Sequence, residues 1–193
     1  MKDGKKITAS REESTSYMNQ TLPMRESFDL IQRDLMIGER VASFYFINGL
    51  NKDDDMLKLM DALLKIKKED MPAGILQFME MAIPYTEVEL IEDFDQVLKN
   101  LFSGVTCLFV DGYEGAIAID CRTYPARSVE EPDKDKSLRG SRDGFVETVV
   151  SNTAMIRRRI RSEHLVMEMQ EVGDSSRTDI AICYMKDRVN KEI

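Results

Sequence analysis

The sequence is poor in the side chains from which catalytic and metal sites are commonly built. It has one histidine, His164, and three widely spaced cysteines without a CxxC pair. Cys107, Cys121 and Cys183 each lie in an apolar run, where a free cysteine behaves as a small buried hydrophobe, and the odd number fits a reducing compartment. His164 follows a predicted helix, where we expect a structural role at the helix C-terminal end. Without a nucleophile beside a base, we expect no enzyme, no cofactor and no metal.

Long apolar runs are also missing. No stretch approaches the ~18 residues that a membrane-spanning helix needs, and residues 1–20 lack the apolar segment of a signal peptide. Taken alone, the chain is therefore predicted to be a soluble protein that faces the cytosol. Its 193 residues suit one domain of ordinary size or two small ones.

The charge is acidic overall and basic in one segment. A formal net charge of −8 argues against nucleic acid as a partner, because duplex binding depends on neutralising phosphates. Residues 139–161 carry six arginines and two acidic residues, a local charge of +4, so the remainder of the chain sums to −12. A basic helix in such an acidic chain is the feature from which we infer function.

Hydrophobic periodicity predicts a mixed α/β (α+β) protein of two related subdomains, each a small mixed β-sheet with hairpins, packed by helices. The predicted parts are a flexible polar tail (1–27), a first α/β subdomain (28–124), a charged connector (125–138), and a basic helix with the start of a second subdomain (139–193). The predicted strands lie at 27–38, 41–49, 86–91, within 104–121 as a hairpin, and at 164–172 and 178–185. The predicted helices lie at 53–66, 72–83, 93–102 and 145–161.

An internal repeat links the two subdomains. Residues 41–54 resemble residues 180–193, and residues 30–38 resemble residues 165–173, with a turn four residues longer in the second copy. The matched positions include Ala42 with Ala181, Tyr45 with Tyr184, and Asn51-Lys52 with Asn190-Lys191. A helix follows the first copy, whereas the chain ends at the same point of the second. We therefore expect the second subdomain to be incomplete here and the native polypeptide to continue beyond Ile193.

The basic helix has a predicted inward face. Four apolar residues share that face: Phe145, Val149, Ile156 and Ile160. Asn152 falls within this stripe and Arg159 lies at its edge. Because an unpaired buried polar group costs about 1–3 kcal/mol, both need partners. In a structural interpretation they bind strand-end carbonyls or a carboxylate and fix the orientation of the two subdomains; in a functional one they contact a neighbouring subunit or a ligand.

The other arginines of this helix, Arg157, Arg158 and Arg161, are predicted to point to solvent or to a partner. Guanidinium groups suit carboxylates and phosphates. In so acidic a chain, the acidic surface of a neighbouring copy is the first candidate, with lipid headgroups or an anion as alternatives.

A second candidate site lies just before the helix. Arg139 and Arg142 flank Gly140 and Gly144 near the helix N-terminus, where backbone N–H groups could bind an anion. Asp143 competes with an anion as a helix cap, and the two glycines are expected to form a turn.

The same segment resembles a known family. An Arg-Gly-x-Arg-[Glu/Asp]-Gly-Phe element (139–145), an Asn-Thr pair (152–153) and an Ile-Arg-Arg-Arg-Ile run (156–160) occur in order. With Gly-Leu-Asn-Lys-Asp-Asp and Phe-Val-Asp-Gly-Tyr-Glu-Gly elsewhere, the chain resembles the A subunit of GerA-type spore germinant receptors over most of 28–193. Ser141 stands where proline is common in the family, and Asp143 where glutamate is common.

The resemblance implies a non-enzymatic N-terminal domain of a membrane protein of bacterial endospores, whose transmembrane C-terminal region is absent from this chain. It implies B and C subunits and other A subunits as partners, and the spore inner membrane as location, with this domain facing the cytosol. It also implies a part in nutrient sensing, signal transmission and receptor assembly. The alternative is a small-molecule (nutrient or anion) binding module, with a pocket between its subdomains lined by Asn152, Arg139 and Arg142.

Overall fold

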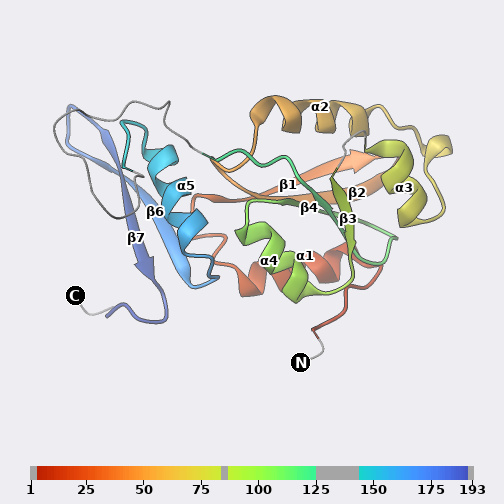
Figure 1. Ribbon diagram of the computed structural model, residues 1–193, viewed down its shortest axis with the longest axis horizontal. Helices are drawn as coiled ribbons and strands as arrows, with labels where there is room; N and C mark the ends of the chain where they lie inside the picture. The colour runs from red at the N-terminus through yellow and green to blue at the C-terminus, as the bar shows by residue number, and fades with distance from the viewer. Residues whose placement is uncertain (1–3, 84–86, 125–143, 191–193) are drawn as a thin grey trace, which may run out of the picture.

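The computed structural model describes residues 4–83, 87–124 and 144–190. These residues form a larger unit on a five-stranded sheet and a smaller unit on a two-stranded sheet (Figure 1). The predicted α/β fold class is thus confirmed. Within the described ranges, no helix is long and apolar enough to cross a membrane.

The larger unit has the sheet order β1-β2-β4-β5-β3, and its ladders are antiparallel rather than mixed. Its strands are β1 (Leu30–Ile37), β2 (Arg40–Ile47), β3 (Val88–Ile91), β4 (Thr106–Val110) and β5 (Ala116–Ile119). Its helices are α1 (Arg11–Thr21), α2 (Asp53–Leu64), α3 (Ile75–Ala82) and α4 (Phe94–Phe102), with a 3-10 turn at Lys68–Asp70.

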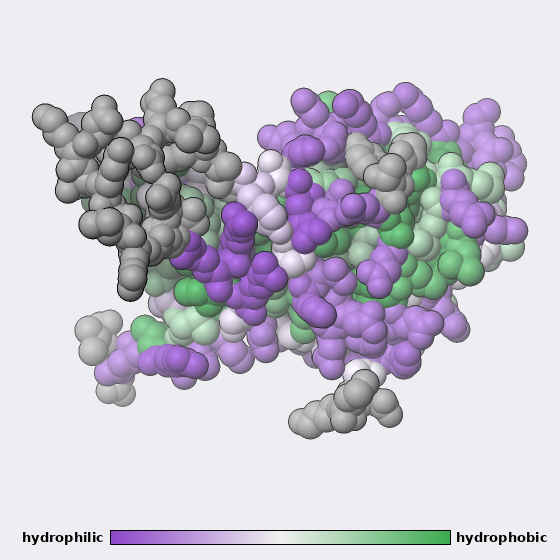
Figure 2. All heavy atoms as spheres, in the orientation of Figure 1, coloured by the Kyte–Doolittle hydropathy of each residue, from purple (hydrophilic) through white to green (hydrophobic). Residues whose placement is uncertain are grey.

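Helices cover both faces of this sheet. Figure 1 shows α2 on one side of it and α1 with α4 on the other. Because neighbouring strand residues face opposite ways, Tyr45 of β2 packs in one apolar core with Met18 of α1, whereas Phe44 packs in the other with Leu59 of α2. The outer surface of α2 is hydrophilic, and hydrophobic side chains gather by α3 (Figure 2), where Met81 is exposed.

Local sequence signals explain most of these elements. Three aspartates occupy the first turn of α2, where the helix dipole favours negative charge. The Asp93 side chain caps α4 by accepting a hydrogen bond from the backbone N–H of Gln96 at 2.9 Å. A helix was predicted to begin at Pro72, but α3 begins three residues later, at Ile75.

The N-terminal segment contains a helix, so the prediction of a flexible tail was wrong for residues 11–21. The hydroxyl of Ser10 caps α1 by accepting a bond from the backbone N–H of Glu13 at 3.2 Å. The Arg11 guanidinium binds the hydroxyl of Ser43 at 2.6 Å and also binds Asp34. Polar contacts therefore hold much of this helix, and they leave little apolar periodicity to detect.

The smaller unit consists of α5 (Val149–Arg159), β6 (Leu165–Val172) and β7 (Thr178–Met185). Helix α5 lies between the β6–β7 hairpin and the larger unit (Figure 1). Like β1–β2, this hairpin pairs two eight-residue strands antiparallel. The aligned tyrosines differ in register, since Tyr45 lies opposite Gln32 and Tyr184 opposite Val166. The predicted connector, 125–138, lies wholly outside the described residues, and the continuation beyond Ile193 stays a prediction.

Candidate functional site

Helix α5 carries the predicted interaction residues, and Asn152 ties down the segment that precedes it. The Asn152 side chain accepts a bond from the backbone N–H of Val146 and donates one to the Val146 carbonyl oxygen, each at 2.7 Å. Both ends of the amide are therefore engaged by the segment just before α5. Asn152 thus binds neither the strand-end carbonyl nor the carboxylate of the structural interpretation, and its predicted contact with a subunit or ligand stays a prediction.

Arg157 is fully buried, and its guanidinium lies against a carboxylate of the larger unit. Its Nε donates to Oδ2 of Asp29 at 2.6 Å, and its Nη2 donates to Oδ1 of the same residue at 3.0 Å. Both side chains are 0% exposed. The pair joins α5 to the residue directly before β1, 128 positions earlier in the chain.

The remaining donors of Arg157 are also satisfied. Nη1 donates to the carbonyl oxygen of Ser162 at 3.1 Å, and Nη2 to that of Leu165 at 3.0 Å. Nη2 also lies 3.1 Å from the hydroxyl of Ser27, which itself donates to Asp29 at 2.6 Å. Among the described residues, no buried side-chain nitrogen or oxygen lacks a hydrogen-bond partner.

Backbone bonds extend this network into β6. The N–H of Met167 donates to the hydroxyl of Ser27 at 2.9 Å, and the N–H of Phe28 donates to the carbonyl oxygen of Met167 at 2.9 Å. We call the whole set the joint network; it comprises Arg157, Asp29, Ser27, and the backbone groups of Phe28, Ser162, Leu165 and Met167. It fastens both α5 and β6 to the start of β1.

The chemistry of the joint network requires arginine. Removing a charged pair from water costs several kcal/mol per ion, about what a forked and fully hydrogen-bonded geometry can offset. Arginine has five N–H donors in a planar fork, which matches a carboxylate and leaves donors for the carbonyl oxygens. A lysine could not reach all of these acceptors at once. The joint network therefore ties the smaller unit to the larger one at Asp29.

Close backbone packing supports the same contact. Gly49, in the turn after β2, has a φ of +82°, and a Cβ built there would lie 3.0 Å from the Cβ of Ala154 and 3.1 Å from Cγ1 of Val150. Both contacts are tighter than most real Cβ contacts. Helix α5 thus lies directly on the β2 turn, and the small residues at 49 and 154 permit this approach.

The predicted facing of α5 was wrong. Arg157 was predicted to point to solvent and Arg159 inward, but Arg157 is buried and Arg159 is exposed. Phe145 and Ile160 were placed on the inward face and are 66% and 41% exposed. The buried residues of the helix are Thr153, Ala154 and Arg157.

The error has a physical cause. The helix was oriented by its large apolar residues, whereas the contact face is built from small residues and one paired charge. The sequence did contain a signal for a buried acidic partner. The polar residues Ser27 and Asp29 come just before a strand that begins with the apolar pair Leu30–Ile31.

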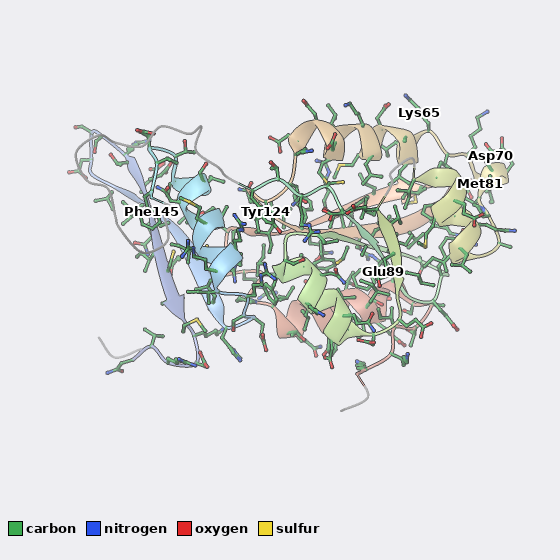
Figure 3. The ribbon with its side chains drawn as sticks, viewed as in Figure 1. Lys65, Asp70, Met81, Glu89, Tyr124 and Phe145 are labelled. Carbon is green, nitrogen blue, oxygen red and sulfur yellow. The ribbon has the colours of Figure 1, made fainter. Side chains whose placement is uncertain are left out.

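Arg158 makes a second contact with the larger unit. Its guanidinium carbon lies 4.0 Å from the ring centroid of Tyr124, and the Tyr124 hydroxyl donates to the carbonyl oxygen of Ser103 at 3.2 Å. Tyr124 lies between α5 and the larger unit, with Phe145 on the other side of α5 (Figure 3). Arg161 is exposed, and its Nε donates to the Arg158 carbonyl oxygen at 3.2 Å.

The predicted anion site before α5 lies almost wholly outside the described residues. Arg139, Gly140, Arg142 and Asp143 lie outside the described residues, and their anion-binding and capping roles stay predictions. Gly144 is half-buried and precedes α5.

The other predicted positions give no further site. His164 is exposed beside Glu163, with their side chains 3.8 Å apart. Within the described ranges, no three histidine, cysteine, aspartate or glutamate side chains are grouped so as to hold a metal ion. Cys183 is exposed, so the expectation that all three cysteines are buried was wrong for this one.

Comparisons with known proteins agree on one family. The model of the Bacillus/Clostridium GerA spore germination protein family matches residues 16–193. Stage V sporulation protein AF of Bacillus subtilis is 38% identical over 92% of the chain, and spore germination protein KA of the same organism is 30% identical over 86%. The chain spans about a third of the length of these relatives, 36% and 32% respectively.

A solved structure shares the fold. The N-terminal domain of the A subunit of the Bacillus megaterium spore germinant receptor GerK3 matches with a TM-score of 0.71 and 20% identity. The match covers 99% of this chain and 70% of that one.

Proposed function

The chain belongs to the Bacillus/Clostridium GerA family of spore germination proteins, and from this premise we propose that it is the non-enzymatic N-terminal domain of a germinant receptor A subunit. In this proposal it takes part in nutrient sensing, signal transmission and receptor assembly during germination. Its partners are the B and C subunits and other A subunits. The domain faces the cytosol at the spore inner membrane, to which a further C-terminal region attaches it.

The joint network is the observation that carries this proposal. A binding module that closes over a solute needs polar groups available between its two units. Here the polar groups between the units bind each other, since Arg157 uses its donors on Asp29, Ser162 and Leu165. Such a contact supports a rigid element that passes a movement from one unit to the other, and thus favours assembly and transmission over a nutrient pocket at the joint network.

The exposed arginines give this rigid element a surface for a partner. Arg158 and Arg161 are exposed on or directly after α5, next to the exposed Ile160. Guanidinium groups beside an apolar side chain suit an acidic protein surface. We propose that this surface contacts a neighbouring receptor subunit.

Charge reversal in the full-length receptor tests the proposal. The variant Arg158→Glu with Arg161→Glu leaves Arg157 in place, and Lys58→Glu with Lys99→Glu makes the same charge change on exposed residues of α2 and α4. We expect the arginine variant to lower the receptor level or slow nutrient-triggered germination, and the lysine variant to do neither. An arginine variant with an unchanged level and unchanged germination would contradict the assembly role.

The nutrient-binding alternative has its own measurement. Calorimetric titration of this chain with candidate nutrients would show heat of binding if the chain holds a nutrient site. Flat titrations with all of them would exclude that alternative at the concentrations used, without affecting the assembly proposal.

A further inference from the structure

The two edges of the five-stranded sheet differ in length. At the β3 edge, the N-terminal segment runs alongside the end of the strand: the N–H of Ile7 donates to the carbonyl oxygen of Glu92 at 2.9 Å, and the N–H of Phe94 donates to that of Lys5 at 3.0 Å. Strand β3 has four residues, whereas β1, at the other edge, has eight. Each edge is thus met by another segment only just outside its strand, since the N–H of Phe28, before β1, also donates to the carbonyl oxygen of Met167 in β6. Along Leu30–Ile37 itself, no strand of the described chain is paired on the outer side, and this is the longer edge.

The alternation of hydrogen bonds between β1 and β2 shows which backbone groups of β1 point away from β2. The N–H of Asn48 donates to the carbonyl oxygen of Asp29 at 2.8 Å. In an antiparallel ladder such pairs alternate, so the backbone groups of Gln32, Asp34 and Met36 point away from β2. Within the described ranges, the N–H groups of these three residues have no recorded hydrogen-bond partner. They are available to pair with another strand.

A groove of about 640 Å³ runs along the first half of this edge. It touches the consecutive residues Leu30, Ile31 and Gln32, and because consecutive strand residues face opposite sides of a sheet, a hollow that touches all three must lie at the edge. Its opposite wall is formed by the end of α1, the loop at 22–26, and Lys186 of the smaller unit. The volume lies within the usual range of ligand sites.

The charges along the groove are positive on balance. Arg25 lines the groove, whereas Arg33 lies on β1 just beyond it and on the opposite face of the sheet from α1, since it pairs with Phe44. Both arginines are exposed, and within the described residues neither is in an ion pair. The nearby acids are already neutralised: Glu26 pairs with Lys186 at 2.5 Å, and Asp34 pairs with Arg11. The Arg11 and other hydrogen bonds hold the pKa of Asp34 below its usual value against the opposing effect of burial, so Asp34 stays ionised and paired.

We propose that the free edge of β1 is a docking site for an extended segment of a partner protein that carries acidic side chains. The segment adds to the sheet as a further antiparallel or parallel strand, bonded to the outward groups of Gln32, Asp34 and Met36. Its carboxylates meet Arg25 and Arg33. Charged residues in an edge strand often prevent pairing, but here the negative charge of Asp34 is neutralised, and the remaining charge selects an acidic partner. The site lies mainly on the larger unit, with Lys186 of the smaller unit in the groove wall, and includes no residue of α5.

Residue-resolved hydrogen exchange of the 193-residue chain, measured by NMR, tests the proposal. The probe is a synthetic peptide of about eight residues, a usual strand length, in which adjacent glutamates among valines place carboxylates on both faces of the added strand, at about 1 mM. Without peptide, the N–H groups of Gln32, Asp34 and Met36 should exchange much faster than those of Arg33 and Leu35, which bond to β2. With peptide, exchange of the outward three should slow by about tenfold or more.

Two results would overturn the proposal: outward N–H groups that are already protected without peptide, or groups that the peptide leaves unchanged. Arg25→Glu with Arg33→Glu should weaken peptide binding by about tenfold or more, whereas the matched Lys58→Glu with Lys99→Glu should not. A peptide with lysine in place of glutamate should fail to bind. Equal binding of that peptide would refute the acidic partner. All of these readouts are independent of receptor assembly, so the α5 proposal stands or falls separately.

Discussion

The two hairpins of the molecule have the same local design and opposite surroundings. Both pair two eight-residue strands antiparallel. In β1–β2, helices cover both faces, and Phe44, Tyr45 and Ile47 are at most 1% exposed. In β6–β7, burial is confined to the start of β6, and Ile180 and Ile182 are 37% and 41% exposed. Burial is therefore set by the helices that pack on a hairpin, because the hairpin pattern is alike in both.

The two hairpins are also held by different forces. The first is enclosed by apolar side chains from α1, α2, α3 and α4. The second is attached to the larger unit through α5 and a buried ion pair. A buried pair adds little net stability over an apolar contact, but it is strongly destabilising when one partner is removed. The attachment of the smaller unit thus includes a buried polar network that is sensitive to the loss of one partner, whereas the larger unit is enclosed by apolar contacts.

The largest effect is expected from breaking that contact. Arg157→Ala leaves the Asp29 carboxylate buried without its partner, and such a loss costs about 3–5 kcal/mol. Urea denaturation followed by circular dichroism measures the change. Arg158→Ala is the matched control, because it removes only the exposed stacking on Tyr124, a contact of about 0.5–1 kcal/mol. Equal effects of the two variants would show that the smaller unit is not held by the joint network.

Replacing both partners sharpens the same comparison. Arg157→Met with Asp29→Leu removes both charges and retains apolar volume, and buried pairs replaced in this way are often neutral. We expect the double variant to be more stable than Arg157→Ala. A double variant as unstable as the single one would mean that the joint network is stabilised mainly by the hydrogen bonds from the Arg157 side chain to backbone carbonyl oxygens, rather than by its ion pair with Asp29.

The enclosing helices should produce the next largest contrast. Leu59 of α2 is 0% exposed, and Leu→Ala at such a site costs about 2–5 kcal/mol. Ile182→Ala removes a side chain of the same size from β7, but the 41% exposure of Ile182 predicts a loss below about 1 kcal/mol. Comparable losses in urea denaturation would indicate that β6–β7 is covered in solution.

Sequence reasoning succeeded where structure is decided locally. The apolar periodicity of α2 and the Asp-Gly turn between β4 and β5 depend on neighbours a few residues apart. It failed for α1, whose anchoring by Arg11 to Asp34 joins two distant segments. It failed again for Arg157, because the carboxylate that buries it lies 128 residues away and no periodicity connects them. Arg157 was predicted to meet an acidic surface of a neighbouring copy, but the carboxylate that it binds, Asp29, belongs to the same chain.

A smaller effect is expected at the turn beneath α5. Gly49 and Gly173 have φ values of +82° and +93°, so alanine at either position costs about 1 kcal/mol of backbone strain. At Gly49 the added Cβ also meets Ala154 and Val150 of the packed α5, and overpacking adds about 1–3 kcal/mol. At Gly173 it would lie 2.4 Å from Oγ of the exposed Ser176, a side-chain end that can rotate away. Gly49→Ala should therefore be more destabilising than Gly173→Ala in the same denaturation assay. The reverse order would mean that α5 does not press on the β2 turn.

The smallest perturbation is chemical labelling of the cysteines. Burial raises the pKa of Cys107, in β4, to about 12 and that of Cys121 to about 11. Cys183, in β7, is exposed, although partial burial and the charge of Asp29 raise its pKa above the usual value. We expect iodoacetamide to label Cys183 in the folded chain, and Cys107 only on unfolding, as measured by peptide mass spectrometry.

The pH dependence of this labelling separates access from ionisation. Since the thiolate is the reactive form, the rate at Cys183 should still be rising at pH 9, because its pKa lies above the usual value. Cys107 should stay unlabelled at that pH, both because it is enclosed and because its thiol remains protonated. Labelling of Cys107 at a rate near that of Cys183 would refute the contrast between an enclosed and an open hairpin. A protected Cys183 would show instead that something covers β7 in solution.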